Sequence, residues 1–255
     1  MKKNILLSVC AFVFCCGTVS LRASTVDLQF DQYNRAYAEG RTAEALQGYQ
    51  TLLNNHQISA SLLFNLANAS YRQGDVARAV LNYERARLLK PSDPDIRANL
   101  DLVRRSSGLT VAEDPFWKRA LLFFSLDQWA WFGFSAFLLA SLISCIRGVW
   151  QNFWPARPCP QQLFNFSMVA ALLLILPAAA GLFVQSRDLD RAVVMHNEVM
   201  LKLSPFDKAE AVGELHAGET VRPLKEFDNY VLVENQSGRR GWVGKSQIET
   251  LLPQS

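Results

Sequence analysis

The sequence predicts a multidomain membrane protein with three structured parts: an α-helical solenoid of repeats, a hairpin of two transmembrane helices and a small all-β barrel. Charged residues make up only 19% of the 255-residue chain, below the roughly 25% of an ordinary soluble domain. The deficit is confined to three stretches without a charged residue, 4–21, 128–146 and 163–184. Between and after them, one aqueous part repeats itself every 34 residues and another alternates apolar and polar residues.

Residues 1–23 have the pattern of an export signal, because two lysines precede an apolar run that is too short to span a bilayer comfortably. We expect cleavage after Ser20, with Ala23 as the second candidate. Cys15 and Cys16 leave a lipoprotein interpretation open, although neither cysteine follows the small residue that lipoprotein processing requires. The mature chain is therefore expected to begin outside the cytoplasm.

Residues 24–111 contain the repeat, whose period of 34 is typical of a helix-turn-helix solenoid. The positions that match without a gap are Phe30/Phe64, Asn34/Asn68, Tyr37/Tyr71, Gly40/Gly74, Ala45/Ala79 and Tyr49/Tyr83. We expect Gly40 and Gly74 to end the first helix of each unit, because glycine enters the left-handed conformation at little cost. A third, partial unit that starts at Pro94 is expected to cap the stack.

The unit that runs from Leu63 to Asp75 and continues to Pro91 resembles the tetratricopeptide repeat. This resemblance implies that the first helix of each unit lines a groove for a peptide or for the tail of a partner. The candidate groove residues are Phe30, Asn34, Tyr37, Phe64, Asn68, Tyr71 and Arg72. The alternative is that the aromatic residues are core residues, as periodic aromatics usually are, and that the asparagines are solvated.

Residues 128–149 and 163–184 are predicted to be transmembrane helices, because each reaches the roughly 20 apolar residues that a bilayer requires. Tryptophans such as Trp129 at the ends of the first span suit the headgroup region. Pro177 should kink the second span. The connection 150–162 contains Arg157, closely follows Arg147 and has no acidic residue, as is typical of a cytoplasmic loop.

Residues 112–127 mix aromatic and basic side chains and are predicted to form an amphipathic segment in the membrane interface; the alternative is that they begin a longer first span. Residues 185–191 are interpreted as a linker. Because the signal exports the amino-terminal module and two crossings return the chain, both soluble modules are expected to be periplasmic or extracytoplasmic. The protein would then lie in a bacterial inner membrane.

Residues 192–255 contain short strands separated by turn-forming pairs, which predicts five or so strands that close into a small barrel. The opening strand Val199–Lys202 and the Gly241–Val243 hairpin segment resemble a bacterial SH3-type domain. Phe227, Tyr230 and Trp242 are candidates for a surface that binds peptides or cell-wall material. The alternative, which we favour at this stage, is that Trp242 fills the core.

The sequence offers no catalytic residues, no metal site and no cofactor site, since its three histidines are isolated and known catalytic motifs are missing. Neither soluble module has the basic excess that nucleic-acid binding needs. SH3-type domains accompany cell-wall hydrolases, so a lytic enzyme is a rival hypothesis. It lacks a stretch of chain for a catalytic domain, because each long aqueous stretch is already a repeat or a barrel.

The order of parts resembles the tetratricopeptide component of the Bat aerotolerance operons, the BatE-like family. This resemblance implies partnership with membrane-anchored von Willebrand A-type Bat proteins and indirectly with a MoxR-type AAA+ ATPase, in tolerance of oxidative or envelope stress. We therefore expect a non-enzymatic inner-membrane scaffold that contacts the lipid bilayer and binds partner proteins through both modules. The alternative is a cell-envelope sensor whose SH3-like domain binds peptidoglycan.

Overall fold

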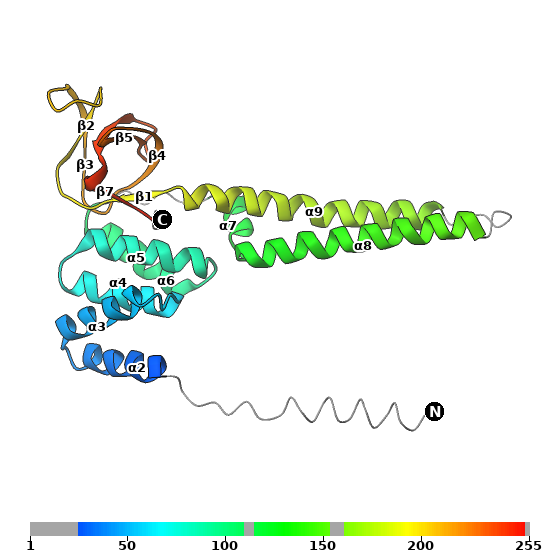
Figure 1. Cartoon of the computed structure of the whole chain (residues 1–255), viewed down its shortest axis with the longest axis horizontal. Helices are drawn as coiled ribbons and strands as arrows, with labels where there is room; N and C mark the ends of the chain where they lie inside the picture. Colours follow the sequence, from blue (N-terminus) through cyan, green and yellow to red (C-terminus); the bar gives the residue numbers. More distant parts are fainter. Residues whose placement is uncertain (1–24, 110–114, 154–160, 253–255) are drawn as a thin grey trace.

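A computed structural model of the protein describes residues 25–109, 115–153 and 161–252 (Figure 1). The predicted signal peptide, both cleavage positions and the two cysteines considered for lipidation lie outside these residues. The described chain combines a helical part, two long helices and an antiparallel sheet, and the two long helices extend from the rest of the molecule as a hairpin (Figure 1).

The helical part is a stack in which short turns join successive helices. Its elements are α2 (Thr25–Ala38), α3 (Thr42–Asn54), α4 (Ala60–Arg72), α5 (Val76–Leu89) and α6 (Pro94–Ser106). Helix α6 begins at Pro94, as predicted, because the Asp93 side chain accepts hydrogen bonds from the main-chain N–H groups of Asp95 and Ile96. Proline suits this first helical position, where its missing N–H costs nothing.

Three glycines mark the period of 34 in the backbone. Gly40 and Gly74 follow α2 and α4 with φ angles of +83° and +81°, so the prediction that they end these helices is confirmed. Gly108, one period after Gly74, follows α6 with a φ angle of +69°, which the sequence analysis did not anticipate. The partial third unit therefore ends its first helix as the other two do. Ala45 and Ala79 are fully buried.

The hairpin consists of α8 (Leu126–Phe153) and α9 (Gln161–Leu189), and both helices are long and apolar enough to cross a membrane. Helix α9 continues through Pro177. It also includes residues 185–189, which the sequence analysis assigned to a linker. That assignment was wrong because the charged residues there do not end the helix: Asp188 is buried and pairs with Arg87 of α5 and with Lys118.

A short helix, α7 (Phe116–Leu121), is separate from α8, so residues 116–121 do not begin a longer first span. The carbonyl oxygen of Leu121 holds α7 to the hairpin. It accepts hydrogen bonds from Trp129 Nε1 at 2.7 Å and from Gln185 Nε2 at 3.1 Å. Trp129 is only 8% exposed, and a Cβ atom at Gly181 would lie 2.5 Å from its ring nitrogen. This tryptophan therefore packs inside the protein instead of facing headgroups.

The sheet has seven strands among the described residues, all antiparallel, in the order β3-β2-β6-β5-β4-β1-β7. The strands are β1 (Ala192–Val194), β2 (Val199–Lys202), β3 (Ala211–Leu215), β4 (Thr220–Phe227), β5 (Tyr230–Glu234), β6 (Arg240–Gly244) and β7 (Ile248–Thr250), with a 3₁₀ turn, η1 (Lys245–Gln247), before the last. Alternate side chains such as Val231, Val233 and Val243 fill one face. With β1 and β7, the number of strands exceeds the five or so that were expected.

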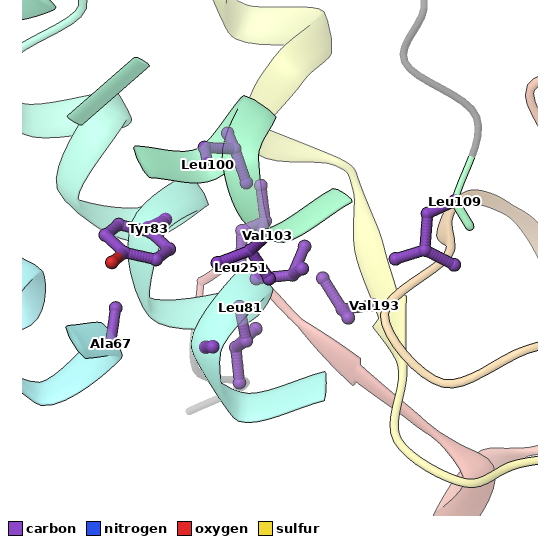
Figure 2. Close-up of a cluster of buried hydrophobic side chains, with 10 residues drawn as sticks. Ala67, Leu81, Tyr83, Leu100, Val103, Leu109, Val193 and Leu251 are labelled. Carbon is purple, nitrogen blue, oxygen red and sulfur yellow. The ribbon is translucent and has the colours of Figure 1, made fainter. Parts of the chain in front are cut away.

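The sheet and the helical stack share a hydrophobic core. Figure 2 shows Val193 and Leu251, from the two ends of the β part, beside Leu81, Tyr83 and Val103 of the helices. All five side chains are at most 2% exposed. Burying such side chains stabilises a fold by about 1.5–3 kcal/mol each, so the two parts form one packed body at the base of the hairpin.

Candidate functional site

The seven predicted groove residues lie on the two neighbouring helices α2 and α4. Phe30, Asn34 and Tyr37 belong to α2, and Phe64, Asn68, Tyr71 and Arg72 belong to α4. Six of them are half-buried and Arg72 is exposed. Their contacts repeat from one unit to the next, so the period seen in the sequence is also a period in the packing.

The two asparagines brace the first helix of each unit against the second. The hydroxyl of Tyr49 donates to Asn34 Oδ1 at 2.8 Å, and the hydroxyl of Tyr83 donates to Asn68 Oδ1. Burial raises the pKa of Tyr49 to about 12 and raises that of Tyr83 further, so both phenols stay protonated donors. Asn34 Oδ1 also accepts from Asn65 Nδ2 at 2.8 Å. The interpretation of these asparagines as merely solvated was therefore wrong.

Aromatic residues of the predicted groove also pack within their units. Phe30 contacts Tyr49 with ring centroids 5.9 Å apart, and Phe64 contacts Tyr83 at 5.7 Å. Aromatic ring contacts of this kind stabilise helix pairs by about 0.5–1.5 kcal/mol each. Each phenylalanine thus packs against its own unit with part of its ring, as the core alternative predicts. Both side chains are only half-buried, so part of each ring remains accessible to a ligand.

Tyr37 and Tyr71 connect successive units. The Arg72 guanidinium stacks 4.1 Å from the centroid of the Tyr37 ring and donates to the Tyr37 carbonyl oxygen at 3.3 Å. One period later, the Tyr71 hydroxyl is 2.8 Å from Ser106 Oγ. Burial raises the pKa of Tyr37, and the charge of Arg72 opposes that change. These residues therefore fix the angle between neighbouring units.

A cavity of about 200 Å³ lies where the first turns of α4 and α6 face each other. Its lining includes Phe64, Asn65, Asp95 and Lys90, of which only Phe64 was predicted. Asn65 could have been found from the sequence, because Asn99 repeats it one period later. The charged residues at this cavity could bind the main chain or a charged side chain of a peptide.

The three candidate residues of the sheet lie together on its outer face. Phe227 and Tyr230 are cross-strand partners in β4 and β5, and the Trp242 ring is 6.4 Å from the Phe227 ring. Lys202, the cross-strand partner of Trp242, places Nζ 5.5 Å from the centroid of the Tyr230 ring. Phe227 is 51% exposed. We call Lys202, Phe227, Tyr230 and Trp242 the aromatic face.

The favoured prediction that Trp242 fills the core was wrong. Along β6 the residues on either side of it, Gly241 and Val243, are buried, so Trp242 points to the opposite side and is half-buried. The inner side has no room for a larger residue at position 241, because a Cβ atom there would lie 2.4 Å from Leu201 Cγ.

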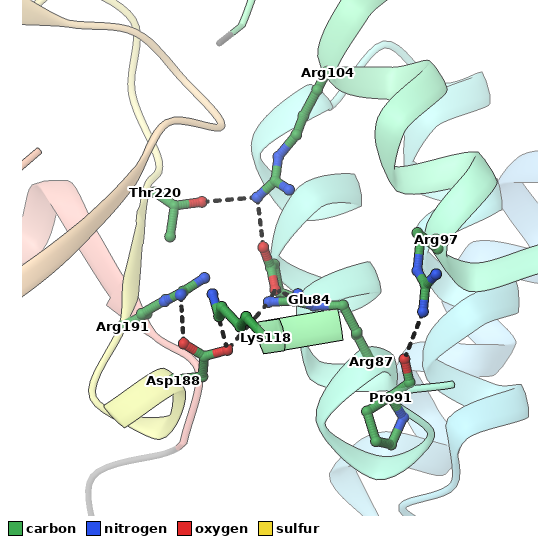
Figure 3. A network of polar contacts seen from close by, with 9 residues as sticks. All are labelled: Glu84, Arg87, Pro91, Arg97, Arg104, Lys118, Asp188, Arg191 and Thr220. Atoms are coloured by element: carbon green, nitrogen blue, oxygen red, sulfur yellow. Dashed lines mark hydrogen bonds and ion pairs between the residues drawn. The ribbon is translucent and has the colours of Figure 1, made fainter. Parts of the chain in front are cut away.

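A buried ion network joins the helices, the hairpin and the sheet (Figure 3). Glu84 on α5 is 0% exposed and pairs with Arg87 at 2.7 Å and with Arg104 on α6. Arg104 also donates to Thr220 Oγ1 on β4 at 3.0 Å. Burial by itself would raise the pKa of Glu84, but the neighbouring arginines hold it far below its usual range. Glu84 is therefore a carboxylate that holds the parts together.

Asp188, near the end of α9, is the second carboxylate of this network. It pairs with Arg191, with Arg87 at 3.8 Å and with Lys118 of α7 at 3.9 Å (Figure 3). Sequence reasoning missed both carboxylates, because important partners, Arg104 for Glu84 and Lys118 for Asp188, lie on other elements. The period of 34 did not predict that Glu84 is buried either, since it aligns Glu84 with the exposed Gln50.

Within residues 25–109, 115–153 and 161–252, no cluster of three histidine, cysteine, aspartate or glutamate residues could hold a metal ion. The three histidines, His56, His196 and His216, are all exposed. The described residues thus present candidate binding surfaces and a buried ion network. No protein-family model matches the sequence, and no curated protein matches it either.

Proposed function

We propose that this protein is a non-enzymatic scaffold of a bacterial inner membrane, with a tetratricopeptide-type module and an SH3-type module that bind partner proteins outside the cytoplasm. The observation that carries the proposal is the shared core of Figure 2, which joins both modules at one end of the α8–α9 hairpin. A hairpin that crosses the bilayer twice leaves both of its flanking modules on the same side, and modules that pack together must lie on one side.

The recurrence of contacts every 34 residues supports the tetratricopeptide interpretation. The Asn–Tyr bonds, the Phe–Tyr ring contacts and the left-handed glycines each recur at this spacing. The order of strands and the outward-facing aromatic residues support the SH3-type interpretation. By its resemblance to BatE-like proteins, the scaffold would bind von Willebrand A-type Bat proteins and, through them, a MoxR-type AAA+ ATPase.

The cavity between α4 and α6 is the part of the groove best suited to a test. Ser61, the second residue of α4, is exposed at this cavity, and Ser61→Arg should fill it. Ala43→Arg is the matched control, because Ala43 is the exposed second residue of α3 and does not line the cavity. Full-length protein purified from its native membranes should capture von Willebrand A-type proteins, and Ser61→Arg should lose them. Equal capture by both variants would reject the groove.

The orientation has its own test. Protease added to spheroplasts should digest both modules and leave the connection between α8 and α9 intact. Digestion of that connection alone would reverse the proposed topology.

The aromatic face favours a second function, an envelope sensor that binds peptidoglycan. An exposed phenylalanine and two half-buried aromatic rings beside a lysine suit the mixed apolar and polar surface of a glycopeptide. The test uses full-length protein in detergent, because the β part shares its core with the helices. The sensor is supported if wild-type protein is retained on purified sacculi and the Trp242→Ala variant is not. The control variant, Phe206→Ala, replaces another exposed aromatic residue and should still be retained. No retention of wild-type protein would reject the sensor.

A further inference from the structure

A basic cavity of about 250 Å³ lies where the helices, α7 and the sheet meet. Five cationic residues and one acidic residue are among those that line it. Arg87 and Arg104 are partners of Glu84, and Lys118 and Arg191 are partners of Asp188. Arg222 comes from β4 and Glu234 from β5. Residues from five separate elements or their flanks thus direct cationic groups toward one space.

The cavity keeps a positive excess after its internal ion pairs are formed. Glu84 and Asp188 compensate part of the charge of the arginines that they contact. Glu234, the acidic lining residue, is paired with Arg240 at 2.9 Å. Arg222 is half-buried, and its side chain has no hydrogen-bond or ion-pair partner among the residues that the structure describes. A buried guanidinium gains from an anionic ligand that accepts its hydrogen bonds.

The position of the cavity relative to the apolar spans indicates which anions can reach it. The second span ends at Leu189, and Arg191 follows two residues later. Because the chain advances by at most about 3.6 Å per residue, Arg191 lies within roughly 7 Å of the end of the span. The headgroup layer on each side of a bilayer is about 5–8 Å thick. In a hairpin that crosses the bilayer, the cavity would therefore lie at the depth of lipid phosphates.

Helix α7 supports the same placement. Phe116 and Trp117 are 79% and 50% exposed, and they precede Lys118, which lines the cavity. Exposed aromatic residues beside a lysine are typical of segments that lie in the membrane interface. A lipid whose tails lie along α7 and α9 would have its headgroup beside Lys118 and Arg191.

We propose that this cavity binds the phosphate group of an anionic phospholipid and so fixes the two modules against the membrane surface. Guanidinium groups bind phosphate through paired hydrogen bonds. The volume is below the roughly 300–1,000 Å³ of sites for drug-sized ligands, and it suits a headgroup. Free phosphate has the same chemistry and is distinguished in the experiment. The proposal requires that the hairpin cross a membrane, but it is independent of partner binding.

The first test measures the wild-type protein alone. Full-length protein in detergent micelles is titrated with phosphatidylglycerol, with phosphatidylcholine and with sodium phosphate, and binding is followed by native mass spectrometry and by the rise in melting temperature. Phosphatidylglycerol should bind at least about tenfold more tightly than phosphatidylcholine, which corresponds to the loss of a single charge-assisted hydrogen bond. Equal binding of the two lipids would overturn the proposal. Binding of sodium phosphate without binding of phosphatidylglycerol would overturn the assignment to lipid.

The second test uses Lys118→Gln/Arg222→Gln, which leaves Arg87, Arg104 and Arg191 on their carboxylates. The matched control, Arg119→Gln/Arg239→Gln, removes exposed cations from the same helix and from the chain's β part, outside the cavity. Circular dichroism establishes that both variants are folded. Phosphatidylglycerol affinity should fall about tenfold or more in the first variant and stay unchanged in the second. An equal fall in both would show only a general effect of charge and would overturn the site.

Discussion

Arg85 on α5 donates a hydrogen bond from Nε to the carbonyl oxygen of Leu251, at 2.9 Å, although 166 residues separate them along the chain. Its Nη2 donates to the Thr250 carbonyl oxygen and pairs with Glu249, both at 2.9 Å. One side chain thus binds three consecutive residues of the last strand and its flank. Together with the shared core, this contact makes the sheet part of the helical body instead of a freely moving domain.

Replacing Arg85 by alanine should loosen this docking. Hydrogen bonds from a charged group contribute about 1.5–3 kcal/mol, so Arg85→Ala should lower the free energy of unfolding by about that amount. The measurement is thermal unfolding of full-length protein in detergent, followed by circular dichroism. Arg78→Ala is the control, since Arg78 lies on the same helix, its side chain is 64% exposed and, among the described residues, it forms an exposed ion pair with Asp75 at 3.4 Å. Equal melting temperatures for the two variants would contradict the docking role.

Gly218 gives an independent test of the same interface. Both Gly218→Ala and Gly238→Ala place a side chain on left-handed backbone, at φ angles of +89° and +79°, which costs about 1–2 kcal/mol. Only at position 218 would the new Cβ atom also meet the helical part, 2.9 Å from Leu109 Cδ1; nothing lies within 4 Å of it at position 238. Overpacking adds about 1–3 kcal/mol. We therefore expect Gly218→Ala to be the less stable variant in urea titrations, and the reverse order would refute the close approach.

The bond between Tyr83 and Asn68 should appear as coupling in a double-mutant cycle. Asn68→Ala leaves the buried Tyr83 hydroxyl without its acceptor, at a cost of about 1–3 kcal/mol, whereas Tyr83→Phe removes the donor itself. The double variant should lose less stability than the sum of the single variants, by about 0.5–3 kcal/mol. Additive losses would mean that the bond contributes nothing. Asn34 and Tyr49 form the equivalent pair for a second cycle.

The bond between Tyr83 and Asn68 also affects how partner binding can be tested. A variant at Asn68 that lost a partner would be ambiguous, because the same change weakens the link between α4 and α5. Ser61 avoids the difficulty, since it is exposed and lines the cavity.

Local patterns in the sequence predicted the elements of this fold, because each pattern reports on one element and its immediate neighbours. The period of 34 located Gly40 and Gly74, and it would also have located Gly108 had it been carried one unit further. The alternation in the β part predicted strands. It could also have shown that Trp242 faces outward, because Gly241 and Val243 share the opposite face.

The docking of the two modules could not be predicted in this way. Arg85 and Leu251, or Arg104 and Thr220, are brought together by the packing of whole elements, and nothing near either residue in the sequence signals its partner. For the same reason Asp188 was placed in a linker, residues 185–191. Its burial depends on Arg191 and on Lys118, which lies 70 positions earlier in the numbering of the chain.

Glu84 should make the stability of the protein depend on pH. Its pKa in the folded state is far below the usual 4.5, because Arg87, Arg104 and Arg191 outweigh the opposing effect of burial. As pH falls, the unfolded chain binds a proton at this residue before the folded protein does. The stabilisation from Glu84 is therefore fully present above about pH 4.5 and is lost progressively below it.

Glu84→Gln tests this dependence, because glutamine keeps the shape and removes the charge. At neutral pH the variant should be less stable by about 3–5 kcal/mol, since it breaks a buried ion pair from one side and removes the carboxylate that Arg87 and Arg104 share. The difference in melting temperature between wild type and variant should shrink as pH falls from about 6 to about 3. Glu44→Gln, an exposed carboxylate paired with Arg41, should give a difference near zero throughout. A difference for Glu84→Gln that stayed constant with pH would show that the carboxylate titrates normally in the folded protein.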